Sequence, residues 1–384
     1  MKKSLFFISV IIGALCSCSQ SENDFLEPAS VPTNHQLTAE QAVENANAFL
    51  DYFNRSQTRA SLCQREVATV TACTKSGVKG EATRGQSDEE TAYYVVNYKD
   101  DNGFIIAAAD DRYEPVFAFV EKGHYDGGET GNPGFDIFIK NLVERAIYKS
   151  DSLLFKSENP SGNRTVVGPM LQTAWGVNSP YNQHTQYSVA GPMGVALAQI
   201  AAYYQYPSSL SYTNSAGTPI ATALNWSSIL SECSSNNGQL TQVNTNSSQV
   251  SYFIDYIDAN TNIENPYLST VALERMHDLG FYLEPYVIHS FALDTSDAIV
   301  RGYLDQGRLI YTRGTLATTD PYAQYFNFGH AWVVDGYFDG VNAIFFHCNW
   351  GWDGNYNGWY LSTNFVPYSG HDYNYQRCYL YVYR

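Results

Sequence analysis

Basic residues are scarce in this sequence. Lys and Arg together number 22, against 38 Asp and Glu, so the formal net charge is −16. Binding to nucleic acid needs positive charge to neutralise the phosphates, and this composition therefore argues against a nucleic-acid partner. The acidic balance is instead typical of the surface of a soluble exported protein.

Cysteine is also sparse, with seven residues in a chain of 384. None of the cysteines has the Cys-x-x-Cys spacing of a metal site, and the eight histidines are not spaced as zinc ligands. The sequence therefore predicts no metal and no other cofactor. Seven cysteines are too few for a disulfide scaffold of this length. Cys63 and Cys73 are close enough to pair across a short loop in an oxidising compartment, and the sequence leaves that pairing open.

The first apolar run, Leu5 to Leu15, is too short to span a bilayer. It follows Lys2 and Lys3 and leads into polar residues, which is the pattern of a secretory signal. We therefore predict that residues 1–17 are a signal peptide. The end of this run, Leu15-Cys16-Ser17-Cys18, resembles a bacterial lipobox in which Cys18 carries the lipid.

Residues 18–36 are polar and contain prolines, so we predict a tether between a lipid anchor and the folded protein. This organisation indicates an exported protein that is anchored to the bacterial outer membrane or cell surface and meets the membrane only through its lipid. Cleavage by an ordinary signal peptidase is the alternative, and it gives a periplasmic or secreted protein.

Aromatic residues make up 15% of the chain, which is ample for hydrophobic cores in two domains. The first predicted domain, residues 37–157, is a small α+β unit. Thr38 begins a helix, because its hydroxyl stands three residues before Gln41 in a capping box. Two hairpin strands, a third strand and a second helix follow, at 92–98, 103–109, 116–120 and 135–148. Between Ser56 and Thr91 the sequence is of low complexity, and a run of turn formers at 157–163 marks the domain boundary.

The second predicted domain, residues 158–384, is organised around one helix. Pro192 is suited to the first turn of that helix, and the residues after it are apolar on nearly every face until Pro207. A helix that is apolar all round is buried. Antiparallel strands are predicted later, at 308–312, 330–337, 343–349, 358–361 and 379–383. The fold class is therefore α+β, with a central buried helix packed on an antiparallel sheet.

Two of these strands carry residues that suit catalysis. His330 follows a glycine at the start of one strand, and Asn349 ends the next strand. This arrangement predicts an imidazole within reach of a side-chain amide that orients it, with Trp350 shielding the pair from water. Taken singly, a histidine on a strand or a tryptophan in a turn is more often a structural residue.

Several motifs occur in an order that resembles the streptopain family of papain-fold cysteine peptidases. They are Gly168-Pro169, Trp175, Ser179-Pro180-Tyr181-Asn182, Ala190-Gly191, Ala196-Leu197-Ala198-Gln199-Ile200, Tyr206-Pro207, Gly329-His330-Ala331, Asp335-Gly336 and Asn349-Trp350-Gly351-Trp352. The N-terminal half is similar to the inhibitory pro-domain of that family, in Tyr93-Tyr94-Val95, Gly103-Phe104-Ile105-Ile106 and Asp110-Asp111-Arg112.

The resemblance implies a role for each site residue. His330 matches the general base, Asn349 the residue that orients it, and Trp350 the ring that shields the pair. The nucleophilic cysteine of the family follows the Ala-Gly pair, and here that position holds Pro192. The glutamine that helps to bind the oxyanion is replaced by Val177.

Both departures remove parts that acyl transfer needs. Pro192 has neither a sulfur to attack a carbonyl nor a backbone N–H to bind the oxyanion. Val177 lacks the side-chain donor, and losing one such donor costs on the order of 10²- to 10³-fold in rate. Cys348 and Ser188 are poor substitutes: strand alternation turns Cys348 away from Asn349, and Ser188 lies four residues before the proline.

We therefore expect an inactive homologue of streptopain. It would bind a peptide or protein ligand through the retained cleft, or bind an active relative through its pro-domain. Whether the chain is an enzyme is left open, because an active cysteine-type endopeptidase with a non-standard nucleophile is the first alternative. A surface adhesion or scaffold lipoprotein is the second.

Overall fold

Pro192 begins a helix, as the sequence predicts. In the computed structural model α3 spans Pro192–Tyr204, with Pro192 in its first turn and Gly191 as the N-cap. Every residue from Gly194 to Ala202 is buried, because small and apolar side chains cover all faces of this helix. The helix stops at Gln205, whose φ of 50° lies in the left-handed region.

The structure describes residues 35–56, 65–74, 77–81, 91–148, 165–258, 268–284, 297–315, 329–341, 343–365 and 378–384. The predicted signal peptide, Cys18, Cys63 and the boundary near residue 157 lie outside these residues. Cys73 is a buried free thiol, and burial raises its pKa to about 11. Among the described helices, none is both long and apolar enough to cross a membrane.

The N-terminal half is an α+β unit, as predicted. Its elements are α1 (Ala39–Ser56), β1 (Val67–Thr74), β2 (Gly77–Glu81), β3 (Thr91–Tyr98), the 3₁₀ turn η1 (Lys99–Asp101), β4 (Phe104–Ala108), β5 (Val116–Val120) and α2 (Pro133–Tyr148). The capping box forms: Thr38 N donates to Gln41 Oε1 at 2.9 Å, and Gln41 N donates to Thr38 Oγ1 at 3.3 Å. Strands β3 and β4 form the predicted antiparallel hairpin.

Strand β1 was not predicted, because it lies in the stretch interpreted as low complexity. This strand pairs antiparallel with β3 and carries β2 on its other side. Its sequence, VATVTACT, consists of small and β-branched residues, and several of them are only partly buried. Such a strand lacks the large apolar residues by which the other strands were recognised, although its threonines and valines favour extended structure.

The C-terminal half contains the predicted buried helix and the predicted strands. Its elements are β6 (Val166–Val167), α3, β7 (Ser209–Thr213), β8 (Pro219–Ala223), α4 (Trp226–Ser235), α5 (Thr245–Asp258), α6 (Leu268–Asp278), β9 (Tyr282–Glu284), α7 (Asp297–Asp305), β10 (Leu309–Thr315), β11 (Gly329–Asp339), β12 (Ile344–Asn349), β13 (Gly358–Leu361), η4 (Ser362–Phe365) and β14 (Cys378–Tyr383).

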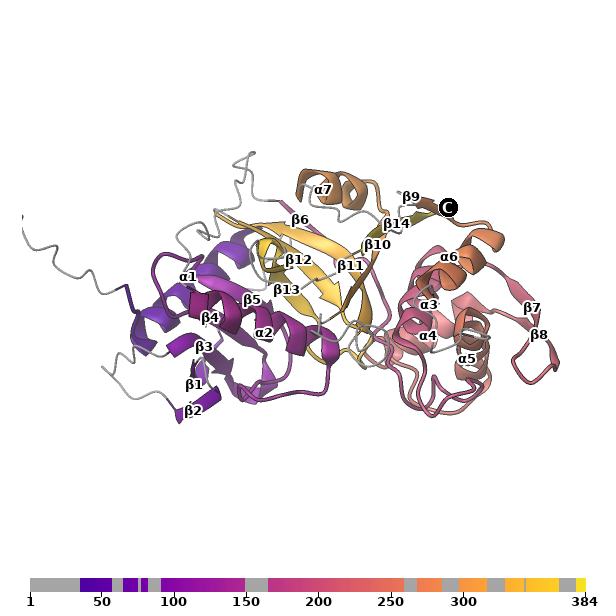
Figure 1. Ribbon diagram of the computed structural model, residues 1–384, viewed down its shortest axis with the longest axis horizontal. Coiled ribbons are helices and arrows are strands. Elements are labelled where there is room, and N and C mark those ends of the chain that lie inside the picture. Colours follow the sequence, from indigo (N-terminus) through magenta and orange to yellow (C-terminus); the bar gives the residue numbers. More distant parts are fainter. Residues whose placement is uncertain are drawn as a thin grey trace, which may run out of the picture. The chain divides into compact units, whose positions relative to one another are not determined.

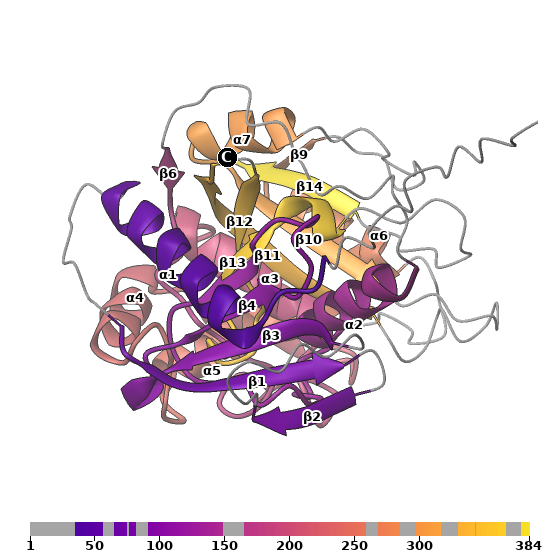
Figure 2. The same cartoon turned by 90° about the vertical axis from the view of Figure 1, so that its left-hand side faces the viewer.

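One sheet runs through both halves (Figure 1). Within the described residues its strand order is β2-β1-β3-β4-β5-β13-β12-β11-β10-β14-β9, with β6 attached to β11. Strands β5 and β13 join the halves by antiparallel pairing that sets Phe119 opposite Trp359. Figure 2 shows α1 lying across the N-terminal strands of this sheet. The N-terminal half is thus hydrogen-bonded into the sheet of the C-terminal half.

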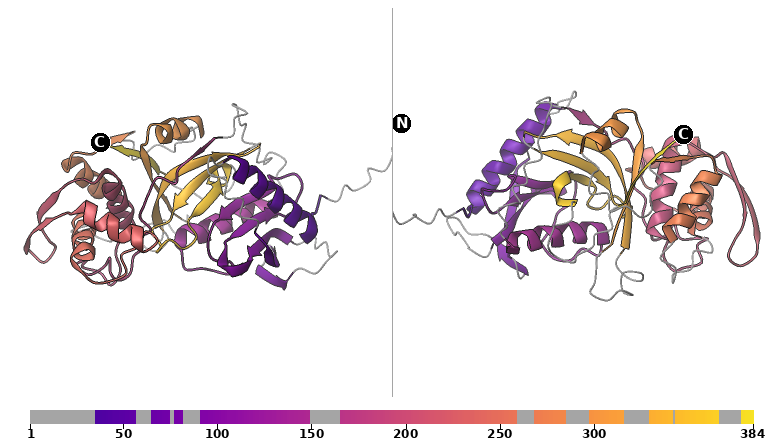
Figure 3. Two further views of the ribbon diagram at one scale, coloured as in Figure 1. Left: turned by 180° about the vertical axis from the view of Figure 1, so that it is seen from behind. Right: turned by 45° about the horizontal axis from the view of Figure 1, so that its top comes forward.

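The two faces of β11 contribute to two hydrophobic cores. Val334 and Phe338 belong to a core that also contains α1 and α2, whereas Ala331 and Val333 belong to a core built around α3 and α5. This division follows from the alternation of side chains along a strand. Figure 3 shows the corresponding separation, with α3 to α6 on one side of the sheet strands and α1 with α2 on the other.

Aromatic rings join α1 to the strands of the C-terminal half. The ring of Phe53 lies 5.0 Å from that of Phe338 and 5.4 Å from that of Trp359, both edge-on. Phe49 makes a similar edge contact with Phe345, at 5.1 Å. Edge-to-face pairs of buried rings contribute about 0.5–1.5 kcal/mol each beyond their burial.

Replacing Phe53 by Ala should therefore destabilise the whole protein. Phe53 is 3% exposed, and truncating such a ring costs about 3–5 kcal/mol. Urea unfolding followed by circular dichroism measures this loss. N47A, at an exposed position on the same helix, is the matched control and should change the free energy of unfolding by less than about 0.5 kcal/mol. A loss below about 1 kcal/mol in F53A would contradict the assigned packing.

Candidate active site

The N-terminus of α3 and the segment that carries Val177 lie side by side. Ala190 N donates to the carbonyl oxygen of Val177 at 2.7 Å, which brings Val177 next to the Gly191-Pro192 turn. Val177 is buried, whereas Pro192 is partly exposed. The two residues predicted to replace the nucleophile and the oxyanion donor are thus neighbours in the fold.

His330 lies on β11 and is 2% exposed. Its Nε2 is 2.7 Å from the carbonyl oxygen of Trp350. A carbonyl only accepts hydrogen bonds, so Nε2 carries the proton and Nδ1 has a free lone pair. No described residue hydrogen-bonds to Nδ1. Burial lowers the pKa of His330 to about 4, although the bond to Trp350 opposes this shift, so the ring is neutral at neutral pH.

Asn349 does not orient the His330 ring in the way that the sequence analysis expected. Its Nδ2 donates to Thr173 O at 2.7 Å, and its Oδ1 accepts from Gln199 Nε2 at 3.2 Å and from Gly351 N at 3.2 Å. The side chain is committed to these partners because the end of β12 faces α3. The backbone of Trp350 takes over the contact with the imidazole.

Three indole rings surround His330. The centroid of the imidazole lies 6.4 Å from the ring of Trp350, 6.3 Å from that of Trp332 and 5.9 Å from that of Trp352. Trp350 is fully buried, and its role in shielding the site from water stays a prediction. Trp332 and Trp352 were not predicted to belong to the site, although they stand two residues from His330 and Trp350.

The N-terminus of α2 covers this aromatic cage from the N-terminal half. A Cβ on Gly134 would lie 2.3 Å from Trp350 Cε3 and 2.7 Å from His330 Cδ2, so the helix approaches this closely only because the residue is glycine. Asn132 caps the helix, with Oδ1 accepting from Gly134 N at 3.1 Å. The sequence alone offered no reason to connect this Asn-Pro-Gly turn with His330.

No thiol or serine of the described residues hydrogen-bonds to the imidazole, because its Nε2 faces the Trp350 carbonyl and its Nδ1 has no partner there. Cys348 is buried in the core that contains α1, on the face of β12 opposite to Asn349, as strand alternation predicted. Cys233 is a buried free thiol that accepts a hydrogen bond from Trp175 Nε1 at 3.3 Å, and burial raises its pKa to about 11. Ser188 is exposed.

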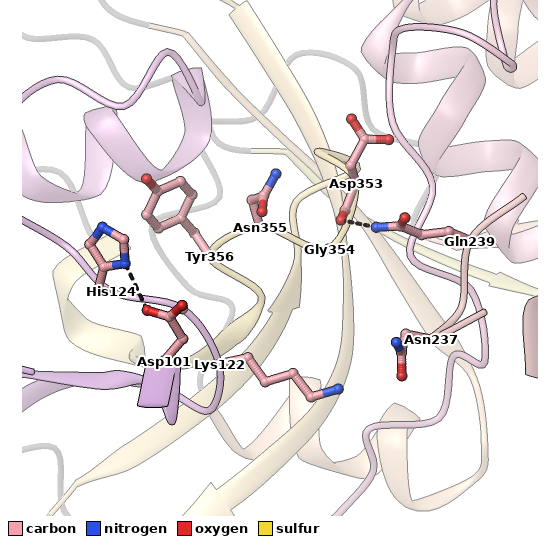
Figure 4. A pocket seen from close by; sticks show the side chains of 10 residues that line it. Asp101, Lys122, His124, Asn237, Gln239, Asp353, Gly354, Asn355 and Tyr356 are labelled. Atoms are coloured by element: carbon pink, nitrogen blue, oxygen red, sulfur yellow. Dashed lines mark hydrogen bonds and ion pairs between the residues drawn. The ribbon is translucent and has the colours of Figure 1, made fainter. Parts of the chain in front are cut away.

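An open pocket of about 440 Å³ lies beside this site (Figure 4). Lys122 and His124 reach it from the turn after β5, and Asn237 and Asn355 from turns of the C-terminal half. The pocket shares Tyr356 with the segment that holds Trp350, because Trp350 Nε1 donates to Tyr356 O at 2.9 Å. This hydrogen bond connects the polar pocket to the segment that holds Trp350, whereas His330 and Trp350 themselves are buried.

One group of side chains among the described residues has metal-ligand geometry, His35 with Asp110 and Asp111. Asp110 already receives Nε and Nη2 of Arg112, at 2.9 and 2.6 Å. His35 Nδ1 lies 2.7 Å from Asp111 Oδ1. This group is remote in sequence from His330, and we assign it no catalytic role.

Comparisons with known proteins agree with this geometry. A family model described as the peptidase C10 family matches residues 175–360, and one described as Spi protease inhibitor matches residues 34–146. The C-terminal region, residues 175–360, belongs to this family, the streptopain family. The C10 match includes Val177, Pro192, His330, Asn349 and Trp350, and the inhibitor match includes the start of α2 that covers His330.

Individual streptopain-family relatives are distant. The thiol protease/hemagglutinin PrtT of Porphyromonas gingivalis is 23% identical over 342 residues, which cover 79% of this chain and 37% of PrtT. Streptopain of Streptococcus pyogenes is 24% identical over 305 residues, covering 70% of this chain and 73% of streptopain. A mutant fragment of prointerpain A from Prevotella intermedia matches in structure with a TM-score of 0.54 and 22% identity, over 76% of this chain and 94% of the fragment.

The buried neutral state of His330 predicts a pH dependence of stability. Its pKa is lowered in the folded protein, so the unfolded chain binds the extra proton as the pH falls from about 6.5 to about 4, and stability is lost over this window. A difference of this size between the two pKa values corresponds to roughly 3 kcal/mol in the free energy of unfolding. H330Q, which retains a donor for the Trp350 carbonyl, should lose about that much less between pH 7 and pH 4 in urea unfolding.

H124Q, at the exposed His124, is the control. It tests whether replacing any histidine by glutamine weakens the pH dependence of stability. Equal pH dependence in H330Q and the wild-type protein would contradict the assigned state of the ring.

Proposed function

We propose that this protein is a catalytically inactive member of the streptopain family that acts by binding a peptide or protein. The observation that carries the proposal is Pro192 in the first turn of α3, at the position that we assign to the nucleophile of the family. A pyrrolidine ring has no atom that can form an acyl intermediate.

The surroundings of Pro192 support the same conclusion. The adjacent Val177 contributes a buried isopropyl group where an oxyanion donor is needed. His330 directs its Nε2 proton at the Trp350 carbonyl and is covered by α2. A general base must come within hydrogen-bonding reach of the proton that it removes, and no described residue occupies that position at Nδ1.

The polar pocket beside the site offers an accessible place for a ligand among the described residues. The site around His330 is itself buried, whereas the pocket is open. Its lining combines three amide side chains with charged and aromatic groups, which are those of Lys122, His124, Asp101, Asp353 and Tyr356. Figure 4 shows Lys122 extending across the opening toward Asn237. Amide side chains offer both a donor and an acceptor, which suits the N–H and C=O groups of an extended peptide.

An active relative is the second kind of partner that we consider. The N-terminal half matches the Spi protease inhibitor model, which favours an interaction related to protease inhibition. In this chain that half packs on its own C-terminal half through β5 and β13. It could therefore meet a second protease only with surfaces that this pairing leaves exposed.

Incubation with casein peptides tests the main proposal. We expect the peptides to bind, as measured by isothermal titration calorimetry, and to be recovered uncut by mass spectrometry. A cysteine-directed activity probe should label neither the wild-type protein nor H330A, because the thiol mechanism lacks its nucleophile.

Reproducible cleavage that H330A abolishes would overturn the assignment and support an active peptidase with a non-standard nucleophile. C348A and S188A, tested singly, would then identify that nucleophile. Absence of peptide binding would leave adhesion or scaffolding as the better hypothesis.

We also propose that the protein is an exported lipoprotein anchored through Cys18. The support is the lipobox-like Leu15-Cys16-Ser17-Cys18 after a basic and apolar leader. Expression in a bacterial host with radiolabelled palmitate should label the wild-type protein and place it in the membrane fraction. C18S should lose the label, whereas C16S should retain it because only the residue after the cleavage site is lipidated. Label on both variants would rule out Cys18.

A further inference from the structure

We infer that the carboxylate of Asp258 is the anion bound at the N-terminus of α3, and that it prevents position 192 from holding a reactive thiolate. Asp258 is the last residue of α5 (Thr245–Asp258) and is 5% exposed. Its Oδ2 accepts a hydrogen bond from Gly191 N at 2.8 Å, and the N–H of Gly194 also donates to this carboxylate.

The two glycines make room for this carboxylate. A Cβ on Gly191 would lie 2.6 Å from Asp258 Oδ2, and a Cβ on Gly194 would lie 2.8 Å from Asp258 Oδ1. Real Cβ atoms do not approach other atoms so closely, so any other residue at either position would displace the aspartate. Because the two glycines stand on either side of Pro192, the negative charge lies within one helical turn of that position.

A helix N-terminus stabilises an anion through its unpaired N–H groups and its positive end. In a cysteine hydrolase with its nucleophile at such a helix start, the thiolate receives that stabilisation. Here the carboxylate takes two of the N–H groups, and Pro192 contributes none. A thiolate introduced at position 192 would lack these donors and face a like charge, and both effects disfavour its charged form.

The charged groups around Asp258 do not remove its negative charge at the pH at which a thiol titrates. Burial raises the pKa of Asp258 to about 7, and Asp255 on the same helix raises it further, whereas the bonds from Gly191 and Gly194 and the charge of Arg275 lower it. Arg275 of α6 directs its guanidinium to the carbonyl oxygens of Tyr256 and Ile257. Asp258 therefore carries its charge in the range where a thiol titrates.

This inference rests on the proposed function, which identifies position 192 with the lost nucleophile, and it adds a second barrier to activity. Restoring the sulfur alone should not restore a reactive site, because Asp258 occupies the end of the helix that would activate it. The substitution that removes this barrier is Asp258→Asn, which keeps the shape of the side chain and removes its charge.

The test measures the pKa of the introduced thiol in P192C and in P192C/D258N. Position 192 is partly exposed, so iodoacetamide can reach it. Alkylation of the peptide that contains position 192 is followed by mass spectrometry from pH 5 to pH 10 in the full chain. We expect a thiol pKa at or above about 8.5 in P192C. In P192C/D258N it should be at least about one unit lower, with roughly tenfold faster alkylation at pH 7.

P192C/D255N is the matched control. Asp255 is a buried carboxylate one turn earlier on α5 that accepts a hydrogen bond from Tyr212 Oη at 2.5 Å. Its removal should shift the thiol pKa by less than half as much as D258N does. Equal shifts in the two double variants, or no shift in D258N, would overturn the inference.

If the variant with D258N does not fold, P192C alone still tests the inference. A thiol pKa below about 7.5 in P192C would contradict the claim that Asp258 disfavours a thiolate at position 192. Cleavage of casein by the wild-type protein would overturn the proposed function without changing these thiol measurements.

Discussion

The relative positions of the site's segments depend on the hydrogen bonds of one buried amide, the side chain of Gln199. Its Oε1 accepts from Trp175 N at 3.1 Å, and its Nε2 donates to Asn349 Oδ1 at 3.2 Å. Asn349 in turn donates to Thr173 O. One fully buried side chain of α3 thus fixes the distance from the helix to the segment before Val177 and to the end of β12. An unpaired amide at this depth would cost about 1–3 kcal/mol, so the three parts are held together.

The same network gives Asn349 and its neighbours structural roles that are independent of catalysis. Asn349 has structural partners that need no catalysis, and Trp350 is part of the aromatic core. The Trp350 carbonyl satisfies Nε2 of His330. These residues therefore have a physical reason to be present that does not depend on a nucleophile at position 192. Their presence alone is not a sign of activity.

The pairing of β5 with β13 has a further consequence for a streptopain-family protein. It makes the inhibitor-like half part of one sheet, and the rings of α1 fill the core on its far side. The inhibitor-like half therefore stabilises the C-terminal half, because it contributes hydrogen bonds and buried aromatic area to the shared core. Its α2 also closes over His330. Stability and closure of the site thus arise from the same packing.

Local patterns along the chain were enough to predict the class of fold, the buried helix and the absence of sulfur at position 192, because periodicity, proline chemistry and residue identity are local properties. The capping box at Thr38 and the strands β3, β4 and β11 to β13 belong to this group. The groups that touch His330 could not be predicted in this way, since Trp350 O and Gly134 reach the ring through turns whose course no local pattern specifies. The carboxylate of Asp258 at the start of α3 was equally hidden, because 66 residues separate it from Pro192 along the chain.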